Sequence, residues 1–152
     1  MRNAELVCFT DQEVLTSKLL LRYLVRNRNI LVRPLLPHRQ FRRAYLDIDC
    51  QVLPSLQDTF SLAIGDGMGF GKPGIVSTAT GIQDLIAHGT NGLVVPAGDV
   101  DALADSLRYF AADRDRLKTM GQAAYATARQ YSWRRFRKSI GDLVESIWAA
   151  RC

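Results

Sequence analysis

The sequence of 152 residues has few of the features that define membrane, metal-binding and disulfide-rich proteins. No stretch reaches the roughly 18 consecutive apolar residues of a membrane-spanning helix, and the first residues lead into no apolar core of a signal peptide. We therefore expect a cytoplasmic location. Three cysteines without a CxxC pair, beside two histidines, favour reduced thiols over a disulfide framework. We expect no metal site.

Acidic residues are fewer than basic ones, 15 against 20, which leaves a formal net charge of +5. The basic excess lies in residues 1–55 and 106–152, on both sides of an acidic middle. Such a charge is compatible with a nucleic-acid partner, but the basic residues lack interleaved aromatic residues and match no motif of that class. We expect no nucleic acid partner. An anionic membrane surface stays open as a partner of the basic ends.

Short apolar runs and longer amphipathic segments alternate along the chain. Continuous apolar runs of strand length are typical of parallel strands that are buried on both faces. We therefore predict an α/β fold with a Rossmann-like, doubly wound parallel sheet that binds its ligand at the carboxyl ends of the strands. Strands are predicted at 6–9, 29–35, 50–54, 74–77 and 93–95, and helices at 12–27, 39–48, 60–70, 81–88, 99–129 and 132–150.

A helix start and two carboxylates follow the third predicted strand. Backbone N–H groups at a helix start are unpaired and lie at the positive end of the helix dipole, so they attract anions. The amides near Ser61 and Leu62 could therefore contact a diphosphate. Asp66 could accept hydrogen bonds from ribose hydroxyls, and Asp58 from those of a sugar. The alternatives are that Asp58 caps the helix and that Asp66 is a solvated helix residue.

A series of motifs runs through the middle of the chain without a gap. In order, they are Leu53-Pro54-Ser55, Asp58 and Asp66 at the ends of a Glu-x7-Glu-like pair, Phe60, Met68, Gly71-Lys72-Pro73, Gly81 and Asp84 of a Gly-Gly-x-x-Glu-like element, Gly89 to Pro96, Gly98-Asp99, and Ser132-Trp133. Together they resemble the carboxy-terminal, donor-binding domain of retaining GT-B glycosyltransferases of the group 1 (family 4) type. A flavodoxin-like or receiver domain would instead need its acidic pocket near the first strand.

The resemblance implies a domain that binds a UDP-, GDP- or ADP-linked sugar for transfer with retention of configuration, without a metal or other cofactor. It implies that Asp58 is the catalytic residue, which holds hydroxyls of the transferred sugar. Arg33 could equally be a surface charge, and Thr80 and Gly81 a plain strand-to-helix turn. The residues expected to bind the nucleotide sugar are Arg33, Phe60, Ser61, Leu62, Asp66, Thr80 and Gly81.

The sequence departs from the family pattern at two places. Both acids are Asp where the family has Glu, which shortens each side chain by roughly 1.5 Å. Gly65, Gly67 and Gly69 stand inside a predicted helix, where each glycine costs about 0.8–1 kcal/mol relative to alanine. We therefore expect a loose or kinked helix that ends at Gly71.

The resemblance also sets the expected domain organisation. Residues 1–131 are predicted to form a Rossmann-like nucleotide-sugar-binding domain without its first strand–helix unit. The basic residues that bind donor phosphates in the family would then be missing, as would the amino-terminal acceptor domain. We therefore expect a donor-domain portion of a glycosyltransferase that either acts with a separate amino-terminal GT-B domain or is a truncated relative of such enzymes. The alternative is a non-catalytic module that binds nucleotide sugars or another protein.

Residues 132–152 are predicted to form an amphipathic helix. Ser132 is a good N-cap, and an apolar stripe lies opposite Arg134, Arg135 and Lys138. Packing of the stripe against the domain is the ordinary expectation. In complete enzymes of this type, the last helix crosses back to the amino-terminal domain. A peripheral contact with the inner membrane face is a further alternative.

Overall fold

The computed structural model describes residues 4–10, 27 and 29–150. All but the last residue of the helix predicted at 12–27 lies outside the described residues. The chain divides into two compact units, residues 1–47 and 48–152, and each is described by itself. The domain boundary predicted at residue 131 stays a prediction.

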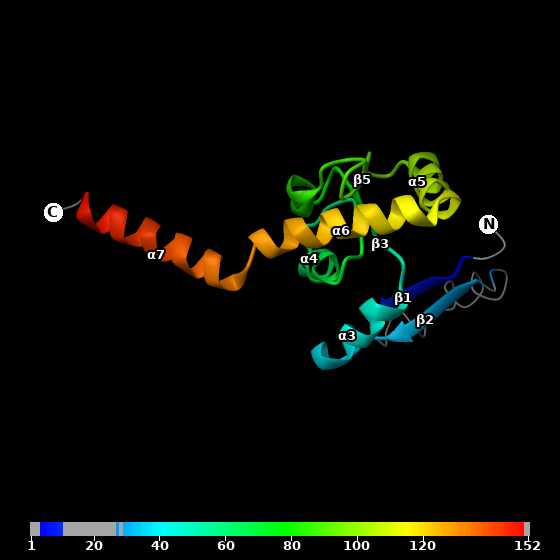
Figure 1. Cartoon of the computed structure of the whole chain (residues 1–152), viewed down its shortest axis with the longest axis horizontal. Helices are drawn as coiled ribbons and strands as arrows, with labels where there is room; N and C mark the ends of the chain where they lie inside the picture. The colour runs from blue at the N-terminus through cyan, green and yellow to red at the C-terminus, as the bar shows by residue number, and fades with distance from the viewer. Residues whose placement is uncertain (1–3, 11–26, 28, 151–152) are drawn as a thin grey trace. The chain divides into compact units, whose positions relative to one another are not determined.

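In its described residues, the first unit contains a pair of parallel strands and one helix (Figure 1). Val7 of the first strand is paired with Leu31 of the second. The rings of Phe9 and Phe41 lie edge to face, with centroids 5.7 Å apart, and so hold the helix against the strands. All three elements were predicted from the sequence. They are β1 (Leu6–Thr10), β2 (Ile30–Pro34) and α3 (His38–Asp47).

The second unit is built on three parallel strands in the order β3-β4-β5. Because neighbouring strands run in one direction, their carboxyl ends meet at the same edge of the sheet. This arrangement confirms the predicted α/β fold with parallel strands. The elements are β3 (Gln51–Leu53), α4 (Leu62–Gly69), β4 (Gly74–Ser77), the 3-10 helix η1 (Gly81–Leu85), β5 (Gly92–Val95), α5 (Val100–Ala112), α6 (Arg114–Gln130) and α7 (Trp133–Ala149).

The central strand β4 is buried along its whole length and separates two apolar clusters. Val76 belongs to a cluster with Ile64 and Met68 of α4. Its neighbour Ile75 belongs to the other cluster, which includes Phe110 of α5. Successive side chains of a strand point to opposite faces, so helices cover both faces of this sheet. That covering explains the continuous apolar sequence of β4.

Helix α4 continues through its three glycines from Leu62 to Gly69, and it stops where the sequence predicted. Gly71 has φ +71°, a conformation that glycine adopts readily. Its N–H donates to the Met68 carbonyl at 2.9 Å, and the N–H of Lys72 donates to the Gly67 carbonyl at 2.9 Å. These two bonds form a Schellman motif, which satisfies the last carbonyls of the helix.

The segment predicted as a helix at 81–88 is helical at 81–85 alone, as the 3-10 helix η1. Buried Asn91 explains this difference. Its Nδ2 donates to the Leu85 carbonyl at 3.0 Å and to Thr127 Oγ1 of α6 at 2.9 Å, while its Oδ1 accepts from the Ala87 N–H at 2.8 Å. Asn91 therefore takes the place of the helical hydrogen bonds that residues beyond 85 would form.

The last three helices begin at side-chain caps. Asp99 accepts from the Ala102 N–H at 2.8 Å, Asp113 from that of Arg116 at 2.9 Å, and Ser132 from that of Arg135 at 3.3 Å. The predicted cap at Ser132 is thus confirmed. Helix α7 contains no buried residue, so the packing predicted for its apolar stripe is not found. Among the described helices, none is both long and apolar enough to cross a membrane.

The glycines of α4 differ in what surrounds them. Gly67 is buried, and a Cβ placed on it would lie 2.2 Å from the side-chain amide of Gln51. That amide donates from Nε2 to the carbonyls of Ile64 at 3.2 Å and of Lys72 at 3.1 Å. It therefore links β3 to the first turn of α4 and to the residues that follow the end of this helix. A Cβ on Gly65 would meet no atom within 4 Å.

We therefore expect opposite effects from the same substitution at these two positions. Gly65→Ala should raise the free energy of unfolding by about 0.5–1 kcal/mol, because it improves helix propensity in open space. Gly67→Ala should lower it by about 1–3 kcal/mol, because it displaces the buried amide of Gln51. Urea denaturation of both variants measures the two changes, and equal effects at both positions would contradict the packing described.

Candidate functional site

The loops that follow β3 and β4 are joined by backbone hydrogen bonds at the carboxyl edge of the sheet. The N–H of Asp58 donates to the Ala79 carbonyl at 3.0 Å, and the N–H of Gly81 donates to the Asp58 carbonyl at 3.2 Å. Asp58 and Thr80 thereby form an isolated parallel bridge. The structure thus brings together three of the predicted site residues, Asp58, Thr80 and Gly81.

Close contact between these loops depends on the absence of a side chain at Gly81. A Cβ at this position would lie 2.0 Å from the Thr59 carbonyl oxygen. Thr80 is almost fully buried, and its hydroxyl donates to the Ser77 carbonyl at 2.8 Å. The Thr80 side chain therefore holds the loop in place. The half-buried Asp58 carboxylate stands at the junction that these contacts fix.

Helix α4 begins at this same edge, directly after the loop that carries Asp58. Its N-cap residue is Ser61, whose side chain makes no capping hydrogen bond. Asp58 is not the cap, so the alternative that this carboxylate serves to cap the helix is wrong. Phe60 and Leu62 flank the N-cap and are 45% and 58% exposed. An accessible helix start without a side-chain cap has the chemistry of an anion site.

Two predicted residues lie further from this junction in the chain. Asp66 is exposed on α4, four residues after Leu62, and so lies on the same helix face about one turn along. Arg33 lies in β2 of the other unit and is exposed. The roles predicted for these residues stay predictions. In the described part of the chain, no three His, Cys, Asp or Glu side chains are grouped so as to hold a metal ion.

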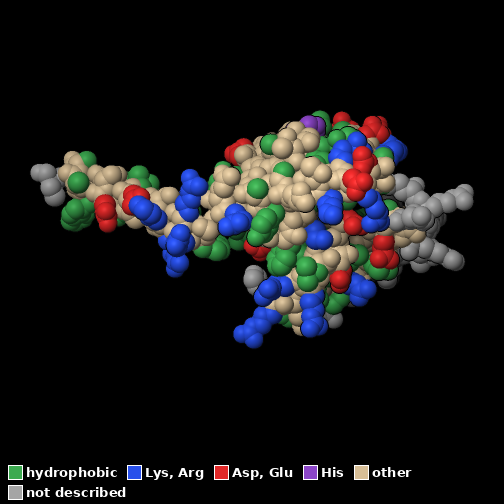
Figure 2. Space-filling view, viewed as in Figure 1, with side chains coloured by type: hydrophobic (Ala, Val, Ile, Leu, Met, Phe, Trp, Pro, Cys, Tyr) green, Lys and Arg blue, Asp and Glu red, His purple; other side chains and the backbone are tan. Residues whose placement is uncertain are grey.

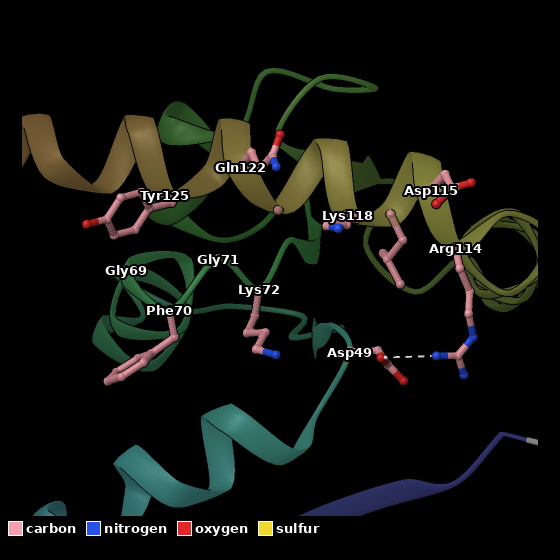
Figure 3. Close-up of a pocket in the computed structure, with 12 residues that line it drawn as sticks. Asp49, Gly69, Phe70, Gly71, Lys72, Arg114, Asp115, Lys118, Gln122 and Tyr125 are labelled. Carbon is pink, nitrogen blue, oxygen red and sulfur yellow. Dashed lines mark ion pairs between the residues drawn. The ribbon is translucent and has the colours of Figure 1, made fainter.

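A cavity of about 640 Å³ lies at the opposite edge of the sheet (Figure 3). Asp49 precedes β3 and Lys72 precedes β4, which places this cavity at the amino ends of the strands. Arg114 Nη1 lies 3.8 Å from Asp49 Oδ1. None of the predicted site residues lines the cavity. Its lining residues are Asp49, Gly69, Phe70, Gly71, Lys72, Arg114, Asp115, Leu117, Lys118, Gly121, Gln122 and Tyr125.

Sequence reasoning missed this cavity. Lys72 was noticed as part of a family motif. Nothing in the sequence distinguishes Arg114 and Lys118 of α6 from other basic residues of a helix. No spacing along the chain relates Lys72 to Lys118. The two meet in one cavity because α6 packs beside α4 (Figure 1).

Comparison with known proteins relates most of the chain to one family. Residues 2–113 match the family described as "Glycosyl transferases group 1". The chain is 29% identical over 111 residues to D-inositol 3-phosphate glycosyltransferase of Corynebacterium urealyticum. The alignment covers 73% of this chain and 26% of that protein. It is 32% identical over 98 residues to a sulfoquinovosyl transferase of Arabidopsis thaliana, covering 62% and 19%. The chain thus spans about a quarter or less of these curated relatives.

Solved structures share the fold. Sucrose-phosphate synthase from Thermosynechococcus elongatus superposes with a TM-score of 0.84 at 22% identity, over 96% of this chain and 39% of that one. Anabaena HepE in complex with UDP superposes with a TM-score of 0.84 at 20% identity, over 94% and 41%. The carboxy-terminal domain of a group 1 glycosyl transferase, LpcC of Francisella tularensis, gives a TM-score of 0.70 at 18% identity, over 80% and 64%.

The contact at Gly81 leads to a prediction for the site loops. Gly81→Ala should lower the free energy of unfolding by about 1–3 kcal/mol, because its Cβ would force the Thr59 carbonyl away. Hydrogen exchange should then accelerate at the amides of Asp58 and Gly81, since both bonds cross this junction. The matched change Gly65→Ala should leave these amides unchanged. Unaltered exchange in Gly81→Ala would show that the two loops are not clamped together.

Cys50 lies beside the cavity residue Asp49 and is half-buried against the α5 side of the core. Burial, and secondly the negative charge of Asp49, raise the pKa of the Cys50 thiol from 9.0 to about 11. Because the folded-state pKa is raised, the protonated thiol stabilises the fold fully below about pH 9. That contribution is lost as the pH rises toward 11.

Alkylation should report this shift directly. At pH 8, Cys50 of the folded chain should react with iodoacetamide about 100-fold more slowly than an ordinary cysteine, since the thiolate fraction falls tenfold per pH unit of pKa shift. The rate should keep rising up to about pH 11. Mass spectrometry of the modified peptide, with urea-unfolded protein as the reference, measures both rates. A Cys50 rate that levels off near pH 9 would contradict the raised pKa.

Proposed function

The chain belongs to the group 1 glycosyl transferases, and on that premise we propose that it is the donor-binding portion of such an enzyme. The observation that carries this proposal is the start of α4, which lacks a side-chain cap beside the Asp58–Thr80–Gly81 junction. Ligands of doubly wound sheets bind at the carboxyl ends of the strands, and this junction lies at that edge. The ligand we propose is a nucleotide-diphosphate sugar.

The diphosphate, the sugar and the ribose of this ligand each have a group of matching chemistry at the junction or along α4. The diphosphate would accept hydrogen bonds from amides near Ser61 and Leu62, where the helix dipole favours negative charge. The Asp58 carboxylate would accept from hydroxyls of the transferred sugar, and Asp66 from those of the ribose. The HepE structures contain UDP and UDP-glucose, which supports a donor of this class. The base is proposed as uracil, guanine or adenine.

We propose that transfer also requires an amino-terminal half with the acceptor site. The chain spans 26% of the D-inositol 3-phosphate glycosyltransferase and 39% of the sucrose-phosphate synthase chain. The half that is not represented could be a separate polypeptide or another part of a longer one. The short side chains of Asp58 and Asp66 favour a second candidate, a module that binds the donor without transferring it.

Two measurements separate these candidates. Calorimetric titration of the chain with UDP, GDP, ADP and their sugar conjugates tests donor binding. Transfer of radiolabelled sugar, measured with and without an added amino-terminal half of a group 1 enzyme, tests the reaction. Binding with transfer supports the enzyme, and binding without transfer supports the module. Absence of binding in the whole nucleotide series would overturn both.

Binding and transfer of the sugar nucleotide should depend on Asp58 more than on an exposed acidic residue elsewhere in the chain. Asp58→Asn removes a charged acceptor while keeping the shape of the side chain, and should weaken sugar-nucleotide binding or transfer about 10- to 100-fold. Asp115→Asn, in the first turn of α6 at the opposite edge of the sheet, makes the same change in charge and should leave both within about twofold. The proposed role of Asp58 fails if the two variants behave alike.

A further inference from the structure

The backbone around Asp58 distinguishes this carboxylate from other acidic side chains of the chain. Figure 2 shows acidic side chains on the surface of α7 and again around α5. Those of α7 are Asp142 and Glu145, which are exposed on their helix. Asp58 is half-buried, and hydrogen bonds hold both its N–H and its carbonyl group. A fixed backbone favours contact with particular hydroxyls, because less conformational freedom is lost on binding.

A buried hydroxyl connects the loop of Asp58 with the loop that follows β4. Ser77 is the last residue of β4 and is 1% exposed. Its Oγ donates to the Ser55 carbonyl at 2.5 Å and accepts from the Ala79 N–H at 3.3 Å. The Ala79 carbonyl in turn accepts from the Asp58 N–H at 3.0 Å. The Ser77 hydroxyl therefore holds Ser55 directly, and it holds Asp58 through Ala79.

The sheet itself does not require a polar side chain at this position. The preceding residues of β4 are buried and carry no polar side chain, and the pairing of β4 with β5 uses backbone groups. A buried hydroxyl costs free energy unless it is hydrogen-bonded, and alanine would fill nearly the same space. Both side-chain bonds of Ser77 go to the two site loops. The hydroxyl therefore contributes to the arrangement of these loops.

The start of α4 is anchored by other contacts. Ile64, in the first turn of the helix, is buried in an apolar cluster of the core. Its carbonyl accepts from the side-chain amide of Gln51 at 3.2 Å. Neither anchor is a hydrogen bond of Ser77. Loss of the Ser77 hydroxyl should therefore displace Asp58, while the amides at the start of α4 stay in place.

We propose that Ser77 is a positioning residue, which places the Asp58 carboxylate for contact with the sugar of a nucleotide-diphosphate sugar. This inference rests on the proposed function and adds a division of roles within the site. Ser77 serves the binding of the sugar, whereas the binding of the diphosphate depends on the start of α4. Ser77 acts through Asp58, because its own hydroxyl is buried and already donates its single proton.

Two hydroxyl deletions give a matched pair of variants for the test. Ser77→Ala removes the positioning hydroxyl with little change in volume. Thr127→Ala is the control, because Thr127 Oγ1 of α6 likewise accepts one bond, from Asn91 at 2.9 Å, and donates another, to the Ala123 carbonyl at 3.1 Å. Circular dichroism and thermal melting confirm that both variants stay folded. Hydrogen exchange at the Asp58 amide should accelerate in Ser77→Ala alone.

The binding experiment is calorimetric titration with UDP, GDP and ADP, each with and without a linked glucose. For the nucleotide that the unaltered chain binds, Ser77→Ala should weaken binding of the glucose conjugate about tenfold and of the bare nucleotide about twofold or less. Thr127→Ala should leave both within about twofold. In a chain that already carries Asp58→Asn, Ser77→Ala should weaken binding of the conjugate by a further threefold or less, roughly, because both changes act on one carboxylate.

Other outcomes overturn the proposal. Equal weakening of the conjugate and the bare nucleotide would show a general loosening of the site. A further tenfold loss in the Asp58→Asn background, roughly, would show that Ser77 acts independently of that carboxylate. Unchanged binding in Ser77→Ala would show that the hydroxyl has no role in the site. Absence of binding by the unaltered chain to the whole series is a different failure, because it overturns the proposed function and this inference with it.

Discussion

The backbone pairing of Asp58 with Ala79 and Gly81 is the constraint on which the carboxyl edge of the sheet depends. The loop after β3 runs from residue 54 to 61 before α4 begins, and a loop of that length has many conformations available. Two hydrogen bonds and the bare backbone of Gly81 hold it against the loop after β4. The position of the Asp58 carboxylate and the direction of the α4 start both follow from this contact.

Local signals in the sequence predicted most of the strands and helices. Apolar runs such as Gly74–Ser77 were recognisable because both faces of β4 are covered. Gly71 was recognisable as a helix end because glycine readily adopts positive φ. The short η1 was not, because buried side-chain bonds of Asn91 to Ala87 and Thr127 replace the helix there. The contact between Asn91 and Thr127 joins residues 36 positions apart in the chain, and such a contact leaves no periodic signal.

The candidate site, like the fold, was predictable from the sequence only in part. Asp58, Thr80 and Gly81 were all predicted as site residues, and the structure joins them at one edge of the sheet. The cavity at the other edge depends on the packing of α6 beside α4, which no spacing in the sequence encodes. For α7, the periodicity identified the apolar face correctly. It carried no information on what covers that face, because helical spacing reports amphipathicity and not the partner.

Helix α4 links the two edges of the sheet, and its polarity relates them. Eight residues at 1.5 Å each make a rod about 12 Å long, with partial positive charge at its start and partial negative charge at its end. Lys72 stands just beyond that end, and Lys118 lines the same cavity. Their ammonium groups offset the negative pole, whereas the positive pole faces the opposite edge without a carboxylate or hydroxyl cap. The cations of the cavity thus balance the helix electrostatically, and they need no bound anion to account for their presence.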